Sequence, residues 1–241
     1  MSRDPIAAGA RSMPIELSWV LPLYRTAEQL GELLARIHEV SRTLGITAET
    51  ILVDDACPDG SGARAEHAAL HDPRVRVLRL PRNRGQDAAL RAGLRESRGQ
   101  WAVIMDADLQ DPPEAIARLW PLRHRFDIVF ARRTGSYSQV ARRITSHLYR
   151  AAVAVVGGLP RGACLYALMS RPVLDRINQA GATRVSLLAL MAAARGRSTS
   201  VTIVRAKRLH GESGYTSLAR CTKAAASLWQ MFAARRLNRV L

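Results

Sequence analysis

The sequence is short of cysteine, of aromatic side chains and of long hydrophobic runs, and each shortage narrows the class of protein. The three cysteines, Cys57, Cys164 and Cys221, are odd in number and widely spaced, so they indicate neither a disulfide framework nor a four-ligand zinc site. This usage fits a reducing cytoplasm. The longest uncharged stretches reach only about half of the ~20 residues that cross a bilayer, and the first residues lack the apolar core of a signal peptide. We therefore expect no transmembrane helix.

Acidic residues are also scarce, but only in the second half of the chain. Residues 1–127 carry 17 Lys and Arg against 18 Asp and Glu, whereas residues 128–241 carry 19 against 2. The net charge of +16 therefore comes entirely from the second half. This asymmetry predicts an anionic partner, such as an acidic membrane surface or a phosphorylated acceptor, with a solvated basic face as the alternative. The sequence has 5% aromatic residues and no recognisable nucleic-acid-binding module, so we do not expect the protein to bind nucleic acid.

What the sequence does contain is a regular alternation of apolar runs and amphipathic helices up to Ala131. Thr26 and Asp111 are expected to cap the helices that follow them. Strands separated by helices predict an α/β fold, with a mostly parallel sheet covered by helices on both faces. In such sheets ligands bind beyond the carboxyl ends of the strands. We expect strands at 17–21, 50–53, 75–80, 101–105 and 128–131, and helices at about 30–37, 62–70, 86–97 and 113–122.

Two carboxylates close the very apolar strand WAVIM. Asp106 and Asp108 are two residues apart, so in an extended chain they point to the same side and can converge on one ion. Carboxylate oxygens suit Mg²⁺ or Mn²⁺, and such an ion would bind a diphosphate and neutralise charge on the leaving group. A pair at this spacing is common by chance, and a strand-end or capping role is the alternative. A second acidic pair, Asp54 and Asp55, closes another strand.

The sequence around the acidic pair is more specific than the pair itself. The stretch NRGQDAALRAGLRESRGQWAVIMDADLQDPPEAI, with VDDACPDGS upstream, resembles the family-2 glycosyltransferases of the GT-A fold, and in particular those of the polyprenyl-phosphate or dolichyl-phosphate type. The resemblance implies a metal-dependent enzyme in which Asp106 and Asp108 hold metal and diphosphate, helped by Gln110, and Asp108 is catalytic. The residues that it implies in binding the nucleotide sugar are Pro22, Tyr24, Asp54, Asp55, Gln86, Asp106 and Arg132.

A basic motif near the end of the chain completes the implied site. Arg205, Arg208, Gly211, Ser213 and Tyr215 match a family segment that contacts donor diphosphate and acceptor phosphate. Two guanidinium forks, a hydroxyl and a flexible glycine suit a phosphate clamp. Arg205 and Arg208 are therefore candidate catalytic residues, and Ser213 is a candidate for substrate binding. An exposed basic strand and turn is the alternative.

The sequence departs from the family pattern in two places. Relatives usually carry Pro-x-Tyr-Asn-Glu, whereas here Arg25 and Thr26 follow Tyr24, which leaves the donor open. Residues 162–168 lack the acid that is commonly proposed as the catalytic base. A sugar hydroxyl would need such a base, worth about 10²–10⁴-fold, but a phosphate monoester with a second pKa of about 6 is already largely dianionic near neutral pH. The missing acid therefore favours a lipid-phosphate acceptor.

Together these observations predict an inverting glycosyltransferase that moves a sugar from a nucleoside-diphosphate sugar to polyprenyl (undecaprenyl) phosphate at the cytoplasmic face of the membrane. The alternatives are a soluble or protein acceptor, or an inactive homologue that only binds sugar nucleotides. We expect a flexible leader at 1–13, a GT-A domain at 14–215 and a basic amphipathic helix at 216–241, which suits peripheral attachment to an anionic membrane. A membrane-protein partner and an oligomer are left open.

Overall fold

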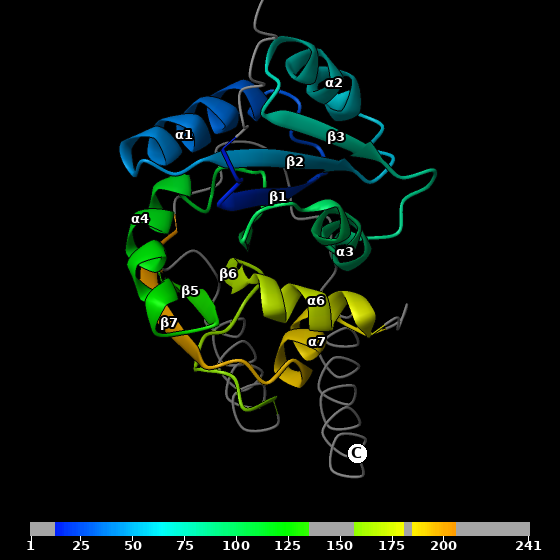
Figure 1. Ribbon diagram of the computed structural model, residues 1–241. Coiled ribbons are helices and arrows are strands. Elements are labelled where there is room, and N and C mark those ends of the chain that lie inside the picture. The colour runs from blue at the N-terminus through cyan, green and yellow to red at the C-terminus, as the bar shows by residue number, and fades with distance from the viewer. Residues whose placement is uncertain (1–12, 135–156, 181–184, 206–241) are drawn as a thin grey trace, which may run out of the picture.

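The first half of the chain alternates strand and helix as the sequence predicts. The computed structural model describes residues 13–134, 157–180 and 185–205 (Figure 1). The predicted core of each element lies inside an observed one, and the boundaries differ by a few residues. The elements are β1 (Leu17–Leu23), α1 (Leu30–Thr43), β2 (Ala48–Asp54), α2 (Ser61–His71), β3 (Val75–Arg79), α3 (Gln86–Glu96) and β4 (Trp101–Ile104).

After β4 the elements are shorter and less regular. The predicted helix at 113–122 is wrong as a single helix, because 3₁₀ turns η1 (Pro113–Ala115) and η2 (Trp120–His124) flank α4 (Ile116–Leu119). Pro121 lacks an amide hydrogen and cannot continue the α-helical ladder at the second boundary. The remaining elements are β5 (Ile128–Thr134), β6 (Ala167–Ser170), α6 (Arg171–Gln179), α7 (Leu187–Ala193) and β7 (Ser198–Val204).

The strands form one sheet in the order β3-β2-β1-β4-β6-β5-β7. Strands β1 to β4 pair in parallel, and so do β5 and β7. Strand β6 lies between β4 and β5 and is antiparallel to both. The other six strands therefore run in one direction, which confirms the predicted mostly parallel sheet. It also brings their carboxyl ends to a common edge.

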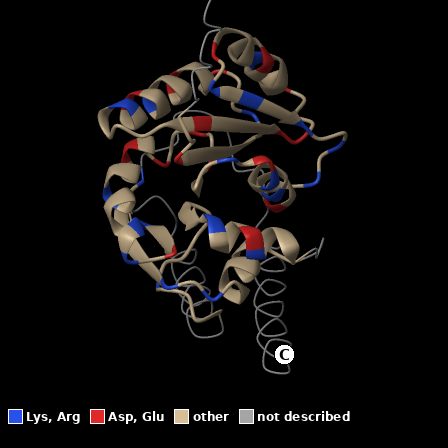
Figure 2. Ribbon diagram, viewed as in Figure 1, with Lys and Arg blue, Asp and Glu red and all other residues tan. Residues whose placement is uncertain are grey.

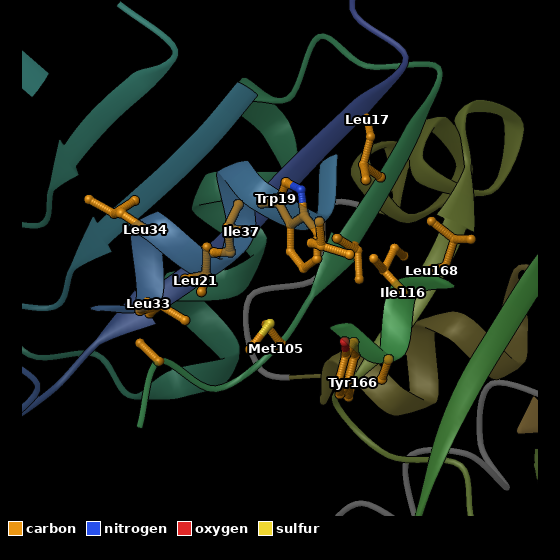
Figure 3. Close-up of a cluster of buried hydrophobic side chains, with 14 of the residues drawn as sticks. Leu17, Trp19, Leu21, Leu33, Leu34, Ile37, Met105, Ile116, Tyr166 and Leu168 are labelled. Carbon is orange, nitrogen blue, oxygen red and sulfur yellow. The ribbon is translucent and has the colours of Figure 1, made fainter. Parts of the chain in front are cut away.

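Helices cover both faces of this sheet, as predicted. On one face, α1, α2 and α4 share a core with alternate residues of β1, among them Trp19 and Leu21. Figure 3 shows this cluster, in which Ile37 of α1, Ile116 of α4 and Leu168 of β6 contribute to one continuous core. On the other face, α3, α6 and α7 pack on the intervening residues of the strands. Burying both faces leaves the edges of the sheet as the places for ligands.

The expected N-cap of the first helix is wrong. Helix α1 begins at Leu30 and its N-cap position is Gln29, three residues beyond Thr26. The backbone of Thr26 is instead engaged in a turn: its amide donates to Ser61 Oγ at 3.1 Å, and its carbonyl accepts from the Gln29 amide at 3.2 Å. Because α2 fixes this turn from outside, the helix starts where the turn ends.

Several predicted features lie outside the described residues, namely the leader, the amphipathic helix at 216–241, and Arg208 and Ser213 of the basic motif. In the described ranges, none of the helices has the length and hydrophobicity needed to span a bilayer. Acidic and basic residues there share the same elements, as Figure 2 shows on α3, which carries Asp87, Arg91 and Arg95. The predicted domain limits stay predictions.

Candidate active site

Four strands deliver charged side chains to the carboxyl edge of the sheet. Asp54 is the last residue of β2, and Asp106 follows β4 by two residues. Arg133 lies near the end of β5, and Arg205 follows β7 directly. Because these strands are parallel, residues far apart in the sequence meet at one edge. The prediction that strand-end residues form the site therefore has a structural basis.

Asp106 is at the centre of this group. Its Oδ2 atom accepts hydrogen bonds from Arg133 Nη2 at 2.9 Å and from Arg205 Nη2 at 3.4 Å. Its Oδ1 atom accepts from Gln86 Nε2, and Gln86 is the first residue of α3. The structure thus brings together three residues that the sequence had nominated, Gln86, Asp106 and Arg205. Arg133 is a fourth member that was not nominated.

Asp111 also belongs to this cluster. Its side chain is fully buried, and it forms ion pairs with Arg133 and, at 3.2 Å, with Arg205 Nε. Burial raises the pKa of the Asp111 carboxyl above its ordinary value, while the two arginines act in the opposite direction. The predicted capping role is wrong, because Pro112 occupies the N-cap position of η1 and no side chain there makes a capping hydrogen bond. The arginines engage this carboxylate instead.

Arg132 and Arg133 are neighbours on β5 and point to opposite sides, as successive strand residues must. Arg132, the nominated residue, is exposed, and its guanidinium donates to Thr202 Oγ1 of β7. It also lies over Gly162, where an added Cβ would come within 2.3 Å of Arg132 Cγ. The structure therefore does not place Arg132 in the acidic cluster. The strand alternation that separates the two arginines was the available signal, but its phase depends on how β5 pairs.

Burial opposes the charge of Arg133, yet its surroundings more than compensate. Desolvation alone would lower the pKa of its guanidinium, whereas Cys164 and the carboxylates of Asp106 and Asp111 raise it above the ordinary value. Arg133 therefore carries a permanent positive charge beside the candidate metal ligands. Such a charge can hold a phosphate oxygen as well as a carboxylate.

Asp108 and Gln110 follow in the turn after β4. Asp108 Oδ1 accepts from the backbone amide of Gln110 at 3.2 Å, and Asp108 is only partly buried. Over the described ranges, no three His, Cys, Asp or Glu side chains are grouped to hold a metal ion. Two carboxylates alone would make an open site, in which substrate oxygens and water complete the coordination, and the predicted role of Asp106 and Asp108 as metal ligands stays a prediction. The predicted help of the Gln110 side chain also stays a prediction.

The acidic pair at the end of β2 is bonded differently. Both Asp55 oxygens accept from backbone amides, those of Arg84 and Gly85, each at 2.7 Å. Asp54 Oδ1 accepts from the Cys57 amide at 2.9 Å, and its Oδ2 lies 3.3 Å from Arg79 Nε. These carboxylates, both almost fully buried, hold loops in place at the edge of the site. Their predicted contacts with base and ribose stay predictions.

The end of β1 lies between the two acidic strand ends, because β1 pairs with both β2 and β4. Pro22 is half-buried there, and Tyr24 is 47% exposed. Arg25, which stands where relatives carry a polar amide, places its guanidinium 5.5 Å from the Tyr24 ring centroid. Both nominated residues are thus located at the carboxyl edge, and Tyr24 offers an exposed ring for a nucleotide.

Residues 162–168 run beside the cluster and contribute packing and hydrogen bonds in place of acid groups. Cys164 Sγ lies 3.1 Å from the carbonyl oxygen of Ala131, and burial raises the pKa of its thiol. The Tyr166 hydroxyl donates to the carbonyl oxygen of Pro112 at 3.0 Å and so fixes the turn that carries Asp111. Residues 162–168 therefore pack into the site, although they supply no carboxylate to it.

Solved structures share this architecture. Glucosyl-3-phosphoglycerate synthase from Mycobacterium tuberculosis, in complex with Mn²⁺ and UDP-glucose, superimposes with a TM-score of 0.63 at 18% identity, over 90% of this chain and 79% of that one. The mannosyltransferase PcManGT from Pyrobaculum calidifontis, in complex with GDP-Man and Mn²⁺, gives 0.58 at 20% identity, over 97% and 77%. These similarities, with the sheet order and its carboxyl edge, define the GT-A glycosyltransferase fold.

The sequence identifies the family within that fold. The profile described as Glycosyl transferase family 2 matches residues 18–177, and the chain belongs to this family. Among curated relatives, the undecaprenyl-phosphate 4-deoxy-4-formamido-L-arabinose transferase of Pseudomonas paraeruginosa strain PA7 is 35% identical over 85% of this chain and 62% of its own length. The protein of the same name from Proteus mirabilis is 31% identical over 84% and 64%. The chain thus spans just over three fifths of the relatives that it matches.

Proposed function

We propose that the protein is an inverting glycosyltransferase that moves a sugar from a nucleoside-diphosphate sugar to undecaprenyl phosphate or a related polyprenyl phosphate. The observation that carries this proposal is the meeting of Asp106 with Arg133 and Arg205 at the carboxyl edge of a GT-A sheet. It supplies oxygen ligands for a cation and guanidinium groups for phosphates in one place. The names of the curated relatives support the lipid-phosphate acceptor.

In this proposal Asp106 and Asp108 hold a divalent cation, Mg²⁺ or Mn²⁺. When bound, such an ion neutralises negative charge on the diphosphate as it leaves. Gln86 orients the Asp106 carboxylate through its amide group. Arg133 and Arg205 bind phosphate oxygens beside it, and the structures of the fold neighbours with Mn²⁺ and a nucleotide sugar support a divalent cation. We extend the same clamp to Arg208 and Ser213, and the donor site to Pro22 and Tyr24.

The chemistry of the acceptor agrees with the lack of a carboxylate in residues 162–168. An oxygen of the acceptor phosphate attacks the anomeric carbon, and a new C–O bond forms on the face opposite the leaving group. The bond from that carbon to the nucleoside diphosphate breaks, and the electron pair leaves with the diphosphate. Because the phosphate is largely dianionic near neutral pH, no side chain has to remove a proton.

Lipid phosphate is found at a membrane, so the proposal includes peripheral attachment at the cytoplasmic face. The excess of 19 basic over 2 acidic residues in residues 128–241 supports attraction to anionic lipid. The amphipathic pattern predicted for 216–241 would add apolar contact.

The direct test is transfer of labelled sugar to undecaprenyl phosphate in detergent, with Mg²⁺ or Mn²⁺ and a panel of nucleotide sugars. Before it, a thermal-shift panel of nucleoside diphosphates with and without Mn²⁺ identifies the base. We expect cation-dependent stabilisation by one diphosphate and transfer from the corresponding donor. Transfer only to soluble acceptors would replace the lipid acceptor in this proposal, and no transfer from any donor would contradict it.

A further inference from the structure

Two carboxylates share two guanidinium groups at the end of β4. Arg133 Nη2 contacts both Asp106 Oδ2, at 2.9 Å, and Asp111 Oδ2. Arg205 spans the same two residues, with Nη2 3.4 Å from Asp106 Oδ2 and Nε 3.2 Å from Asp111 Oδ1. Each arginine is therefore held from two sides. With Asp111 included, the two carboxylates balance the charges of the two guanidinium groups. Without it, the cluster carries one net positive charge.

The two carboxylates differ in burial. The Asp111 side chain is 0% exposed, whereas that of Asp106 is 21% exposed. Water does not reach the buried Asp111 carboxylate, so solvent screens its attraction for the arginines only weakly. Asp111 is thus the constant partner of the two arginines. Asp106 is the partner that faces the site, and it can bind a cation in place of an arginine.

The backbone that carries Asp111 is held firmly. Two prolines follow it, which limits the conformations of the turn. The hydroxyl of the buried Tyr166, which directly precedes β6, donates to the Pro112 carbonyl at 3.0 Å. A carboxylate anchored in this way can hold the two guanidinium groups at fixed positions whatever Asp106 binds.

We propose that Asp111 is a positioning residue that holds Arg133 and Arg205 and thereby keeps Asp106 available to a divalent cation. This inference rests on the proposed function, because it concerns the cation and diphosphate of the same site. Without the Asp111 charge, both arginines depend on Asp106 alone. Their positive charges then compete with the cation for one carboxylate.

The role predicts effects of opposite sign on two ligands. Asp111→Asn should weaken Mn²⁺ binding about tenfold, because Asp106 is left neutralised by two guanidinium groups. Binding of UDP or GDP in the presence of EDTA should be unchanged or tighter, because the arginines lose one competing anion. A merely structural loss would weaken both.

The experiment measures Mn²⁺ affinity by calorimetry, and nucleoside diphosphate affinity in EDTA, for wild type, Asp111→Asn and Glu114→Gln. Glu114 is a suitable control because its carboxylate also pairs with an arginine, Arg36, but at the surface, and we expect no change there. In the double variant Asp111→Asn/Arg205→Gln, Mn²⁺ affinity should return toward wild type, since Asp106 then faces one guanidinium.

Arg205→Gln alone keeps the test decisive if Asp111→Asn does not fold. We expect this variant to bind Mn²⁺ more tightly than wild type, while its affinity for diphosphate in EDTA falls. Unchanged Mn²⁺ affinity in Asp111→Asn, or weaker Mn²⁺ binding in Arg205→Gln, would overturn the positioning role alone. If wild type binds neither Mn²⁺ nor any nucleoside diphosphate, the proposed donor site itself falls.

Discussion

Two acidic strand ends lie at one edge of the sheet, on either side of β1, yet they are bonded in different ways. At the end of β2, Asp55 accepts from two backbone amides of the loop that leads into α3. At the end of β4, the hydrogen bonds that Asp106 accepts within the described part of the chain come from side chains, those of Gln86, Arg133 and Arg205. Backbone donors are fixed by the fold, whereas long side chains can turn to another anion. The first end therefore suits support, and the second suits exchange of ligands.

The largest effect that separates the two ends is expected from Asp108→Ala. Loss of a cation ligand should reduce transfer by at least about 100-fold, the scale of removing one electrostatic contact from a transition state. The melting temperature should change little, because Asp108 is only partly buried. Transfer assays and circular dichroism check both parts, with Asp175→Ala on the exposed side of α6 as the control. Full activity would remove the β4 end from the chemistry.

A smaller effect, mainly on stability, is expected at the β2 end. Asp55→Asn replaces one acceptor oxygen with an amide group that faces a backbone N–H, in a side chain that is 4% exposed. We expect the free energy of unfolding to fall by about 1–3 kcal/mol. Urea denaturation measures it. If stability is unchanged while nucleotide affinity is lost, Asp55 acts directly on the base or ribose and the contrast between the two ends fails.

Gln86→Ala tests the link between the two ends, because Gln86 begins the helix that the Asp55 loop leads into. Its amide donates to Asp106. Removing one hydrogen bond to a carboxylate, worth about 1.5 kcal/mol, should raise the KM for the donor roughly tenfold. We expect kcat to change less, since the backbone stays in place. An effect as large as that of Asp108→Ala would show Gln86 to be a direct ligand.

The smallest effect is expected at Asp72, a carboxylate remote from both strand ends. Hydrogen bonds from Arg74 lower the pKa of Asp72 to about 2, from an ordinary value near 3.8, although partial burial opposes the shift. Since the folded-state pKa is depressed, its stabilisation is present above about pH 4 and is lost as the pH falls through 2. Asp72→Asn should therefore cost under about 1 kcal/mol at pH 6. The cost should vanish near pH 2, with no change in transfer.

The sequence predicted the first half of the fold because each element there is local and amphipathic. The core of β1 and the core of α1 are visible as separate apolar patterns. Strand β6 was not predicted, because its four residues, ALMS, gain their identity as a strand only by pairing between β4 and β5. The sequence of so short a segment does not contain this tertiary information.

The candidate site was predictable where one motif carries it, and not where distant residues meet. Asp106, Gln86 and Arg205 were found from motifs, and Gln86 and Arg205 both contact Asp106 in the structure. Arg133 was missed because the phase of β5 decides which of two adjacent arginines faces the acids. Asp111 was misread as a cap because local sequence favours a helix start, whereas its true partners lie on other strands.

The single reversed strand has a consequence for how this architecture can diversify. Because β6 runs against its neighbours, its first residue, Ala167, pairs with Ile104, the last residue of β4, and with Phe130 of β5. The chain entering β6 must therefore pass along the ligand-binding edge before it joins the ladder. Residues 162–166 precede the paired residues of β6, so they do not set the register of its ladders. Under the proposed function, this entry segment is the place where acceptor preference can change while the strands that carry the donor side keep their register.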